Sequence, residues 1–209
     1  MFNDNIKQTV KIIAKEDVAE KKVSKTKKDT WSKKKLYSII APDFLGGKPV
    51  AETFSLKDKD VVGRVVVLPF SEFTGNYKDF KVKIKLRVTE IKGNEAHTEY
   101  AGQELLRDQV LRTIRRWSSR IDSVDDVKLS DSSTFRVKSL TVSARRVNTA
   151  IKGEIRHSVS SFIKEYLATK TTDQMVEDVN TSKLQSTVEG KARKVYPVRN
   201  VEIRMIQKI

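Results

Sequence analysis

The sequence predicts an α+β fold, in which an antiparallel or mixed sheet curls into a small barrel flanked by helices. Alternation of the β type dominates residues 31–147, the strongest helical periodicity follows at 149–194, and a closing strand is expected at 198–208. Strands that mostly precede helices are typical of this class. A chain of 209 residues with 38% apolar side chains can bury one real core. We therefore expect a basic tail at 1–30 and a single α+β domain at 31–209.

Residues 1–30 are rich in lysine and poor in aromatic side chains, with a weak helical stripe at Ile6, Val10 and Ile13. So few apolar residues bury too little surface to offset the entropy of ordering, and we expect this tail to be flexible unless a ligand binds it. Where the tail meets the domain, five lysines surround Trp31. Trp31 either belongs to the core or contacts RNA, and in both cases it fixes where the tail emerges.

The next segments have the pattern of strands. "GRVVVLPF" at 63–70 predicts a buried strand ended by Pro69, and "FKVKIKLRV" at 80–88 alternates apolar and basic side chains. "KGNE" at 92–95 predicts a turn into a return strand through residues 97–100. The apolar face of the alternating strand carries Phe80, Val82, Ile84, Leu86 and Val88, and its basic face carries Lys81, Lys83, Lys85 and Arg87.

A helix is expected at 102–121, because apolar residues recur there at spacings of three and four. The stripe that should pack on the sheet comprises Leu106, Val110, Ile114, Trp117 and Ile121. Arg112, Arg115 and Arg116 then fall on the solvent side. "DDVKL" and "STFRVKSLTVSARR" predict two further strands joined through the turn residues "SDSS".

The C-terminal part predicts a long helix at 149–168, shorter helices near 173–180 and 183–194, and a closing strand. The inner face of the long helix is expected to carry Ile151, Ile155, Val159, Phe162, Ile163 and Tyr166. In the closing strand Val201, Ile203 and Met205 alternate with polar side chains, which is typical of a half-buried strand.

The sequence contains no recognisable catalytic or metal motif. It has no cysteine, which excludes disulfides and thiolate zinc sites and fits a reducing compartment. GxxxxGK[ST], GxGxxG after a strand and HExxH are all absent. The two histidines, His97 and His157, fall in different elements, and acid pairs such as 125–126 and 177–178 are adjacent rather than held across a cleft. We expect no enzyme activity, no cofactor and no metal. The apolar runs are too short to span a bilayer, and no secretory signal is visible.

The net charge of +15 is concentrated in the terminal parts of the chain. Residues 1–35 hold 11 Lys against 5 acidic residues, 36–144 hold 18 Lys and Arg against 15, and 145–209 hold 13 against 7. A polyanion would therefore be bound mainly by the ends. The alternative is that the charge only keeps the protein in solution. Binding to an acidic membrane face would need a long basic amphipathic helix with large apolar residues opposite, and none is visible.

Several cations have the placement expected of phosphate contacts. The basic face of the 80–88 strand spaces its charges by ~6.6 to 7 Å, twice the strand rise, which is close to the phosphate repeat. The alternative is a solvated face paired with Glu95 and Glu99 across the hairpin. Arginine is favoured where a planar fork meets phosphate, which singles out the arginines of the expected helix and three more after it. The residues expected to bind RNA are Lys21, Lys22, Lys25, Lys27, Lys28, Lys33, Lys34, Lys35, Lys81, Lys83, Lys85, Arg87, Arg112, Arg115, Arg116, Arg145, Arg146 and Arg156.

RNA is preferred over DNA because no helix-turn-helix, basic zipper or zinc-finger pattern is present, and no base-reading RNP motif either. A basic globular domain with a lysine-rich tail is typical of proteins that bind a pre-folded RNA by its shape. The competing class is a free-standing RNA-binding or translation-regulating module that associates with ribosomes only transiently.

The order of several segments resembles a small-ribosomal-subunit family shared by archaea and eukaryotes and absent from bacteria, the S-three-a-e (S-one-e) family. These segments are "DTWSKKKLYSIIAP", "VVGRVVVLPFSEF", "YAGQELLRDQVLRTIRRWSSRID", "FRVKSLTVSARRVNTAIKGEIR" and "VYPVRNVEIR". The resemblance covers roughly residues 20–209, and the moderate length is similar to archaeal members. Residues 1–20 match nothing, and "SDSST" replaces the turn common in the family.

The resemblance implies a small β-barrel flanked by helices and a structural role in the small subunit in the cytoplasm. Family members sit on the platform near the exit of the messenger channel, so mRNA is nearby. They contact ribosomal RNA near its 3′ end and neighbouring platform proteins. Neither a small-molecule substrate nor a membrane partner is implied.

Overall fold

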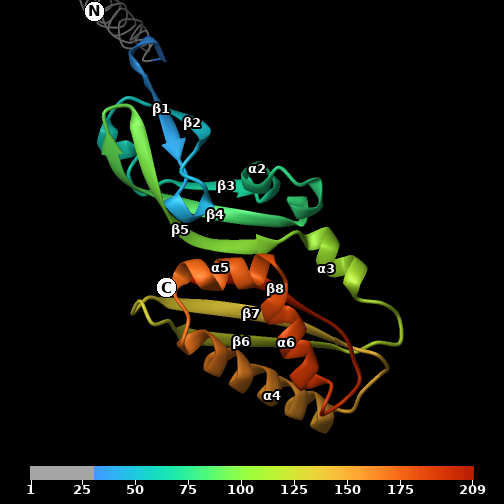
Figure 1. The fold of residues 1–209 in the computed structure, drawn as a ribbon. Helices are drawn as coiled ribbons and strands as arrows, with labels where there is room; N and C mark the ends of the chain where they lie inside the picture. The colour runs from blue at the N-terminus through green and yellow to red at the C-terminus, as the bar shows by residue number, and fades with distance from the viewer. Residues whose placement is uncertain (1–30) are drawn as a thin grey trace, which may run out of the picture. The chain divides into compact units, whose positions relative to one another are not determined.

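Figure 1 shows the fold in a computed structural model, which describes residues 31–209. The chain divides into two units, residues 1–34 and 35–209. In the first unit the described residues form one 3₁₀ turn, η1 (Trp31–Lys33), in which Trp31 is 61% exposed. Of the two roles left open for Trp31, a place in the core is therefore excluded. The expected flexibility of the tail lies outside the described residues.

The second unit contains all the strands and α-helices of the described part of the chain. The strands are β1 (Lys35–Ile40), β2 (Pro49–Ser55), β3 (Val65–Pro69), β4 (Val82–Lys92), β5 (Glu95–Leu105), β6 (Arg120–Lys128), β7 (Thr134–Ser143) and β8 (Val198–Lys208). The α-helices are α2 (Ser71–Thr74), α3 (Arg107–Thr113), α4 (Thr149–Ala168), α5 (Thr172–Asn180) and α6 (Lys183–Ala192), and 3₁₀ turns lie at η2 (Asp43–Leu45), η3 (Asp58–Asp60) and η4 (Tyr77–Lys81). The expected α+β class is confirmed.

The eight strands form one mixed sheet that branches at β5. One edge of β5 pairs with β4 along almost its whole length, as the "KGNE" turn predicted. The other edge pairs first with β1, in parallel, and then with β8, antiparallel. The path continues through β7 to β6, so β5 connects the β1–β4 half of the sheet to the β6–β8 half.

Gly102 makes the junction with β8 possible. Its φ of +151° lies outside the range that side chains favour, and a Cβ built on it would lie 2.2 Å from the carbonyl oxygen of Ile206. No side chain fits between the two backbones at that distance. The sequence analysis placed this glycine at a helix start, whereas it is the residue that lets β8 approach β5.

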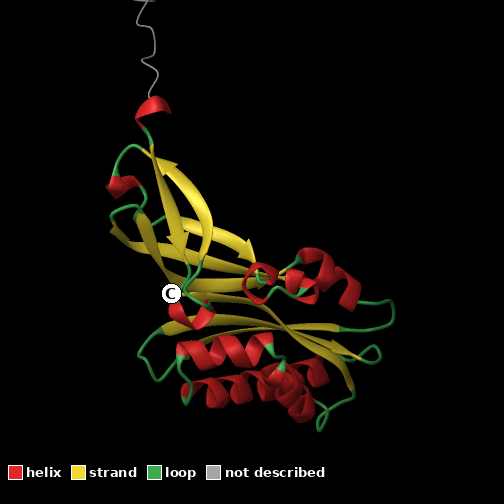
Figure 2. Cartoon of the chain, turned by 45° about the horizontal axis from the view of Figure 1, so that its top comes forward, coloured by secondary structure: helices red, strands yellow, loops and turns green. Residues whose placement is uncertain are grey.

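The expected barrel is wrong, because the sheet is not closed. Its path ends at β2 on one side and β6 on the other, and β3 pairs with β4 alone. Helices α4, α5 and α6 instead cover one face of the β6–β8 half (Figure 2). Alternation along single strands predicts their faces but carries no information on which strands would close a ring.

The expected helix at 102–121 is also wrong in extent. Residues up to Leu105 belong to β5, α3 covers only Arg107–Thr113, and β6 begins at Arg120. Of β6 only the second half was predicted, from "DDVKL"; its first half was assigned to the helix because two of the four inward positions of β6 are polar, with Ser123 and Asp125 buried beside Ile121 and Val127. Apolar residues that belong to three different elements thus fell by coincidence at helical spacing.

Two smaller strand predictions fail in the β3–β4 region. β3 is an edge strand rather than a buried one, since Val65 and Val67 are 47% and 48% exposed. Phe80 lies in η4 and is half exposed, ahead of the strand it was assigned to. The remainder of the alternation in β4 holds, with Ile84 and Leu86 fully buried.

The largest core lies between the sheet and the C-terminal helices, where the helical predictions hold. In α4 the buried positions are Ile155, Val159, Ile163 and Leu167, at spacings of four. Of the other residues expected on the inner face, Ile151, Phe162 and Tyr166 pack partly buried at its margin. α4 packs on β6 and α6 packs on β8, so the helical layer holds the ends of these strands in fixed positions.

Candidate nucleic-acid interface

The expected RNA-binding lysines of the N-terminal region divide at the edge of the described residues. Lys21, Lys22, Lys25, Lys27 and Lys28 lie outside them. Lys33 and Lys35 are exposed, and the Lys34 ammonium lies 3.9 Å from the centre of the Trp31 ring. The structure therefore places three cations next to Trp31 in sequence, one of them in cation–π contact with it.

The basic row of β4 is defined as Lys81, Lys83, Lys85 and Arg87, although Lys81 ends η4 and lies one residue before the strand to which it was assigned. Glu104 of β5 is the direct neighbour of Lys83 and makes a 2.7 Å ion pair with Lys85. Glu99 faces Arg87 and pairs with Lys208. Of the two acids expected across the hairpin, Glu99 is in this position, whereas Glu95 faces Lys92 at the turn. The charge of this row is thus partly offset by two acids of the neighbouring strand.

A second group of cations gathers where β6 begins and β7 ends. We call it the arginine end and define it as Arg115, Arg116, Trp117, Arg145 and Arg146. Its residues come from two loops, 114–119 between α3 and β6, and 144–148 between β7 and α4, and neither loop contains an acidic residue. All five side chains are exposed. In the described part of the chain none of the four arginines makes an ion pair.

Two buried serines fasten these loops to each other. Ser143 Oγ accepts a hydrogen bond from the Ser119 backbone N–H at 2.9 Å and lies 2.6 Å from the Arg145 carbonyl, to which it donates. Ser119 Oγ accepts from the Val147 N–H at 3.0 Å, and the Ser143 N–H donates to the Ser119 carbonyl at 3.0 Å. Because buried polar groups are costly to leave unpaired, this network holds the two arginine pairs in a fixed relation.

Trp117 stands at the tip of the first loop in a conformation that side chains rarely adopt. Its φ is +66° and the residue is 79% exposed. Ser118 supports the turn, because its N–H and its hydroxyl both donate to the Arg115 carbonyl, at 3.3 and 2.5 Å. The expectation that Trp117 packs against the sheet is wrong. An indole is apolar, and its spacing from neighbouring apolar residues gave no sign that the chain turns outward here.

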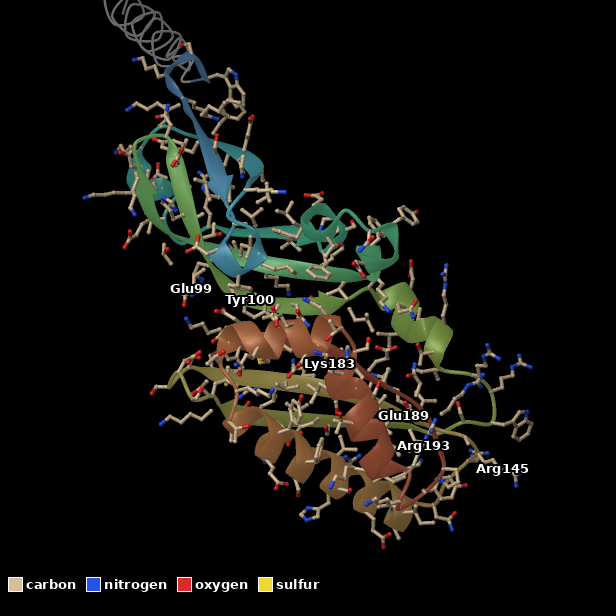
Figure 3. All side chains as sticks on the ribbon, in the orientation of Figure 1. Glu99, Tyr100, Arg145, Lys183, Glu189 and Arg193 are labelled. Carbon is tan, nitrogen blue, oxygen red and sulfur yellow. The ribbon has the colours of Figure 1, made fainter. Side chains whose placement is uncertain are left out.

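A third segment brings further basic residues to this end. The Ala144 N–H donates to the Pro197 carbonyl at 3.0 Å, and Val198 pairs with Ser143. The start of β8 therefore places the exposed Arg199 beside the two loops. Lys194 is also exposed, in the connection from α6, four residues before β8 begins at Val198. Figure 3 shows Arg145 together with Arg193, which is already paired with Glu189 at 2.6 Å. The sequence analysis missed Lys194 and Arg199, although the basic run around Tyr196-Pro197 was visible.

The other two expected arginines lie outside the arginine end and differ in how available they are. Arg156 on α4 is exposed, but its Nε donates to the Asp122 carbonyl at 3.0 Å and so ties the helix to β6. Arg112 is exposed on α3, one turn before the arginine end. Asp122, the nearest acid along β6, is held by Arg120 at 2.9 Å. Its charge is therefore neutralised locally and does not offset the arginine end.

The pKa shifts in the molecule belong to structural groups. Burial raises the pKa of Tyr100 well above its usual value, and burial together with a 2.9 Å hydrogen bond to Asp178 raises that of Tyr166. The hydrogen bond from Arg136 lowers the pKa of Asp126 on the β6–β7 hairpin. None of these groups faces a partner that would make it a general acid or base.

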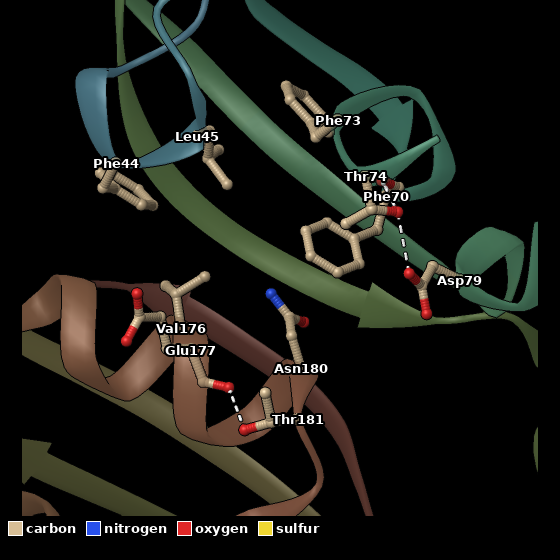
Figure 4. Close-up of a pocket in the computed structure, with 10 residues that line it drawn as sticks. All are labelled: Phe44, Leu45, Phe70, Phe73, Thr74, Asp79, Val176, Glu177, Asn180 and Thr181. Carbon is tan, nitrogen blue, oxygen red and sulfur yellow. Dashed lines mark hydrogen bonds between the residues drawn. The ribbon is translucent and has the colours of Figure 1, made fainter. Parts of the chain in front are cut away.

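A groove of about 410 Å³ lies between η2, α2 and α5 (Figure 4). Its walls are mainly apolar, and Phe44, Leu45, Phe70, Phe73 and Val176 are among the residues that line it. Asp79 accepts a hydrogen bond from Thr74 at 2.8 Å, and no nucleophile–base pair lines the groove. Within residues 31–209 no cluster of three or more His, Asp or Glu side chains is suited to a metal, and no helix is long and apolar enough to cross a membrane.

Comparison of the sequence with known proteins identifies a family and relatives within it. The model of the ribosomal S3Ae family matches residues 22–209. The chain belongs to the ribosomal S3Ae family. Among its relatives, the small ribosomal subunit protein eS1 of Desulfurococcus amylolyticus is 32% identical over 84% of this chain and 83% of that protein. The eS1 proteins of Sulfurisphaera tokodaii and Methanothermobacter thermautotrophicus are 33% and 31% identical over 84% of this chain, and over 91% and 90% of theirs.

The S3Ae match includes every element that builds the arginine end. It begins at residue 22, so the first 20 residues, which resembled nothing, lie outside it. The segment "YAGQELLRDQVLRTIRRWSSRID", one of those that carried the resemblance, runs from β5 through α3 and the Trp117 loop into β6. The family relationship was thus recognisable from residues whose local structure the sequence analysis had assigned wrongly.

Proposed function

We propose that this S3Ae-family protein is a structural constituent of the small ribosomal subunit and acts in the cytoplasm as part of the ribosome. The relatives are named as small ribosomal subunit proteins, and the family is structural rather than enzymatic. Its partners are then small-subunit ribosomal RNA and neighbouring ribosomal proteins. The finer location, on the platform near the messenger exit and the 3′ end of the RNA, belongs to the same proposal.

The observation that carries RNA binding is the arginine end, whose four exposed guanidinium groups have no acidic partner within residues 31–209. Guanidinium groups bind phosphate bidentately and stay charged at any physiological pH. Here they stand on loops fastened by Ser119 and Ser143, so little order has to be gained on binding. Such a surface suits the phosphates of a folded RNA, which it would recognise by shape.

The remaining cations expected to bind RNA contribute to the proposed interface to different extents. The tail and entry lysines add further phosphate contacts, since lysine acts as a point charge on phosphate. Arg112, Lys194 and Arg199 enlarge the arginine end. The basic row of β4 contributes least, because Glu104 and Glu99 already lie across from it.

Incorporation into subunits tests this proposal. A variant with Arg115, Arg116, Arg145 and Arg146 all changed to Gln should fold, because all four side chains are exposed, yet sediment mostly free of small subunits on a sucrose gradient after a high-salt wash. The control removes the same charge elsewhere, by changing the exposed Lys57, Lys59, Lys92 and Lys128 to Gln, and should stay bound.

Two results would speak against the proposal. Loss of wild-type protein into the soluble fraction after the wash would favour the free-standing RNA-binding module. Equal retention of the two four-residue variants would remove the arginine end from the interface while leaving the protein on the subunit.

A further inference from the structure

Trp117 has an arrangement that folding alone does not explain. An indole that is 79% exposed gains little from burial, and a positive φ at a residue other than glycine destabilises the fold. Glycine would adopt the same turn without this cost. A bulky aromatic side chain in this position therefore indicates a ligand that uses the ring.

The loop holds the ring in place before any ligand arrives. Ser118 closes the turn on the Arg115 carbonyl, and Ser119, two residues after Trp117, is buried in the network with Ser143. The ring is thus carried on a short, anchored loop rather than on a free segment. A pre-organised aromatic surface loses little conformational entropy when a flat partner stacks on it.

The surroundings of the ring select the chemistry of that partner. Arg115 and Arg116 precede it directly, Arg145 and Arg146 stand on the loop fastened to its own, and neither loop has an acidic residue. An apolar protein surface would have to desolvate these charges, or supply acids for them. A single-stranded nucleic acid satisfies both features together, because its phosphates pair with cations while its bases present flat π faces.

We propose that Trp117 stacks on an unpaired base of RNA while the neighbouring arginines bind the phosphates beside that base. The inference rests on the proposed RNA-binding function and adds to it a site for a nucleobase. It implies that the RNA at the arginine end is not a continuous duplex. The contact is tolerant of base identity, since stacking uses the face that all bases share.

Fluorescence reports on this contact directly, because the chain has only two tryptophans. In a Trp31→Phe variant, Trp117 is the only indole. Titration with a single-stranded RNA oligonucleotide should quench its emission, whereas a duplex of the same composition should bind with little quenching. Trp117→Ala should weaken binding of the single strand about 5- to 100-fold, as expected for the loss of one stacked base, and Trp117→Phe should restore part of it. Duplex binding should not change.

Each other outcome overturns the inference, and it can be told apart from failure of the proposed function. If the single strand binds and the four-arginine variant loses that binding, yet Trp117 is neither quenched nor required, the phosphate site stands and the base site fails. If Trp117→Ala impairs incorporation into subunits but leaves oligonucleotide binding intact, the ring contacts a protein. If the wild-type protein binds neither RNA, the proposed function fails with the inference. The melting temperature of Trp117→Ala, which should equal that of wild type, excludes misfolding as the cause.

Discussion

The basic row of β4 and the arginine end carry the same number of cations, but they differ in what surrounds them. The row runs from the last residue of η4 along β4, and the partner strand β5 supplies Glu104 opposite Lys83 and Glu99 opposite Arg87. The arginine end lies on two loops with no acidic residue, so its charge has no partner inside the described protein. The two regions have a similar density of positive charge in the sequence. They differ in whether acidic residues lie beside them in the fold.

This difference in acidic neighbours indicates which of the two regions should bind a polyanion more strongly. A phosphate that approaches the β4 row has to compete with Glu104, which pairs with Lys85, and with Glu99, which faces Arg87; exposed ion pairs are individually weak but still offset the field. At the arginine end no ion pair among the described residues relieves the repulsion between like charges, so an external anion has more to gain there. The arginine end depends on the hydrogen bonds of Ser119 and Ser143, which substitutions can remove.

The largest expected effect comes from breaking the sheet that holds both regions. Gly102→Ala would place a Cβ 2.2 Å from the Ile206 carbonyl oxygen, at a φ that alanine rarely adopts. The free energy of unfolding should therefore fall by at least ~3 kcal/mol. Chemical denaturation measures it. Gly153→Ala is the matched control, because it lies in α4 with open space around it and should raise stability slightly. Equal stability of the two variants would show that β8 does not approach β5 as described.

The second effect separates the two regions. Ser143→Ala leaves the buried Ser119 N–H without its acceptor, which should cost about 1 to 3 kcal/mol and loosen the arginine end while the β4 row stays intact. Binding to small-subunit RNA should weaken along with the melting temperature. Ser161→Ala, an exposed serine on α4, is the control and should change neither. A loss of stability without any loss of RNA affinity would show that the two loops need not be fastened together.

A third, smaller effect concerns an arginine that does have an acidic partner. Arg136 pairs with Asp126 at 2.7 Å on the β6–β7 hairpin, and this hydrogen bond lowers the pKa of Asp126. A lowered folded-state pKa adds stability above the ordinary value of about 3.9, and that stability is lost as the pH falls through the folded-state value. The melting temperature of Asp126→Asn should therefore lie slightly below wild type at neutral pH and converge with it in acid. A constant gap at all pH values would contradict this.

The smallest expected effect is that of Trp117→Ala on folding. The helical spacing predicted a buried side chain and a large loss on truncation, whereas the exposed ring should leave the free energy of unfolding unchanged. Leu140→Ala, on the neighbouring strand and fully buried, should instead cost about 2 to 5 kcal/mol. Comparable losses in the two variants would return Trp117 to the core.

The sequence predicted a helix or strand well where a single hydrophobic periodicity extended over the whole element. α4 shows its stripe at Ile155, Val159 and Ile163, and the β4–β5 hairpin announces itself by strict alternation followed by "KGNE". β6 did not, because Asp125 replaces an apolar residue on the inner face, where Ser160 donates to it and Lys164 lies 3.5 Å away. Such a compensated polar position is visible only once the partners are in place.

The sequence predicted the individual residues of the site but not that they lie together. Residue type alone singled out Arg115, Arg116, Arg145 and Arg146, since arginine pairs are typical of phosphate contacts. Nothing local indicated that the two pairs, about thirty residues apart, share one surface, because Ser119 and Ser143 are ordinary in sequence and significant only as contacts. The neutralisation of the β4 row was foreseen as an alternative, although Glu104 was not among the acids considered.

The most direct test measures how the affinity for small-subunit RNA depends on salt in two variants that each lose four cations. If the arginine end binds phosphates, changing Arg115, Arg116, Arg145 and Arg146 to Gln should make the slope of log K against log salt shallower by about 3 to 4, according to whether the RNA is single-stranded or paired. Changing Lys81, Lys83, Lys85 and Arg87 to Gln should alter the slope by less than about 1. Equal changes in the two variants, or a larger change for the β4 row, would contradict the account.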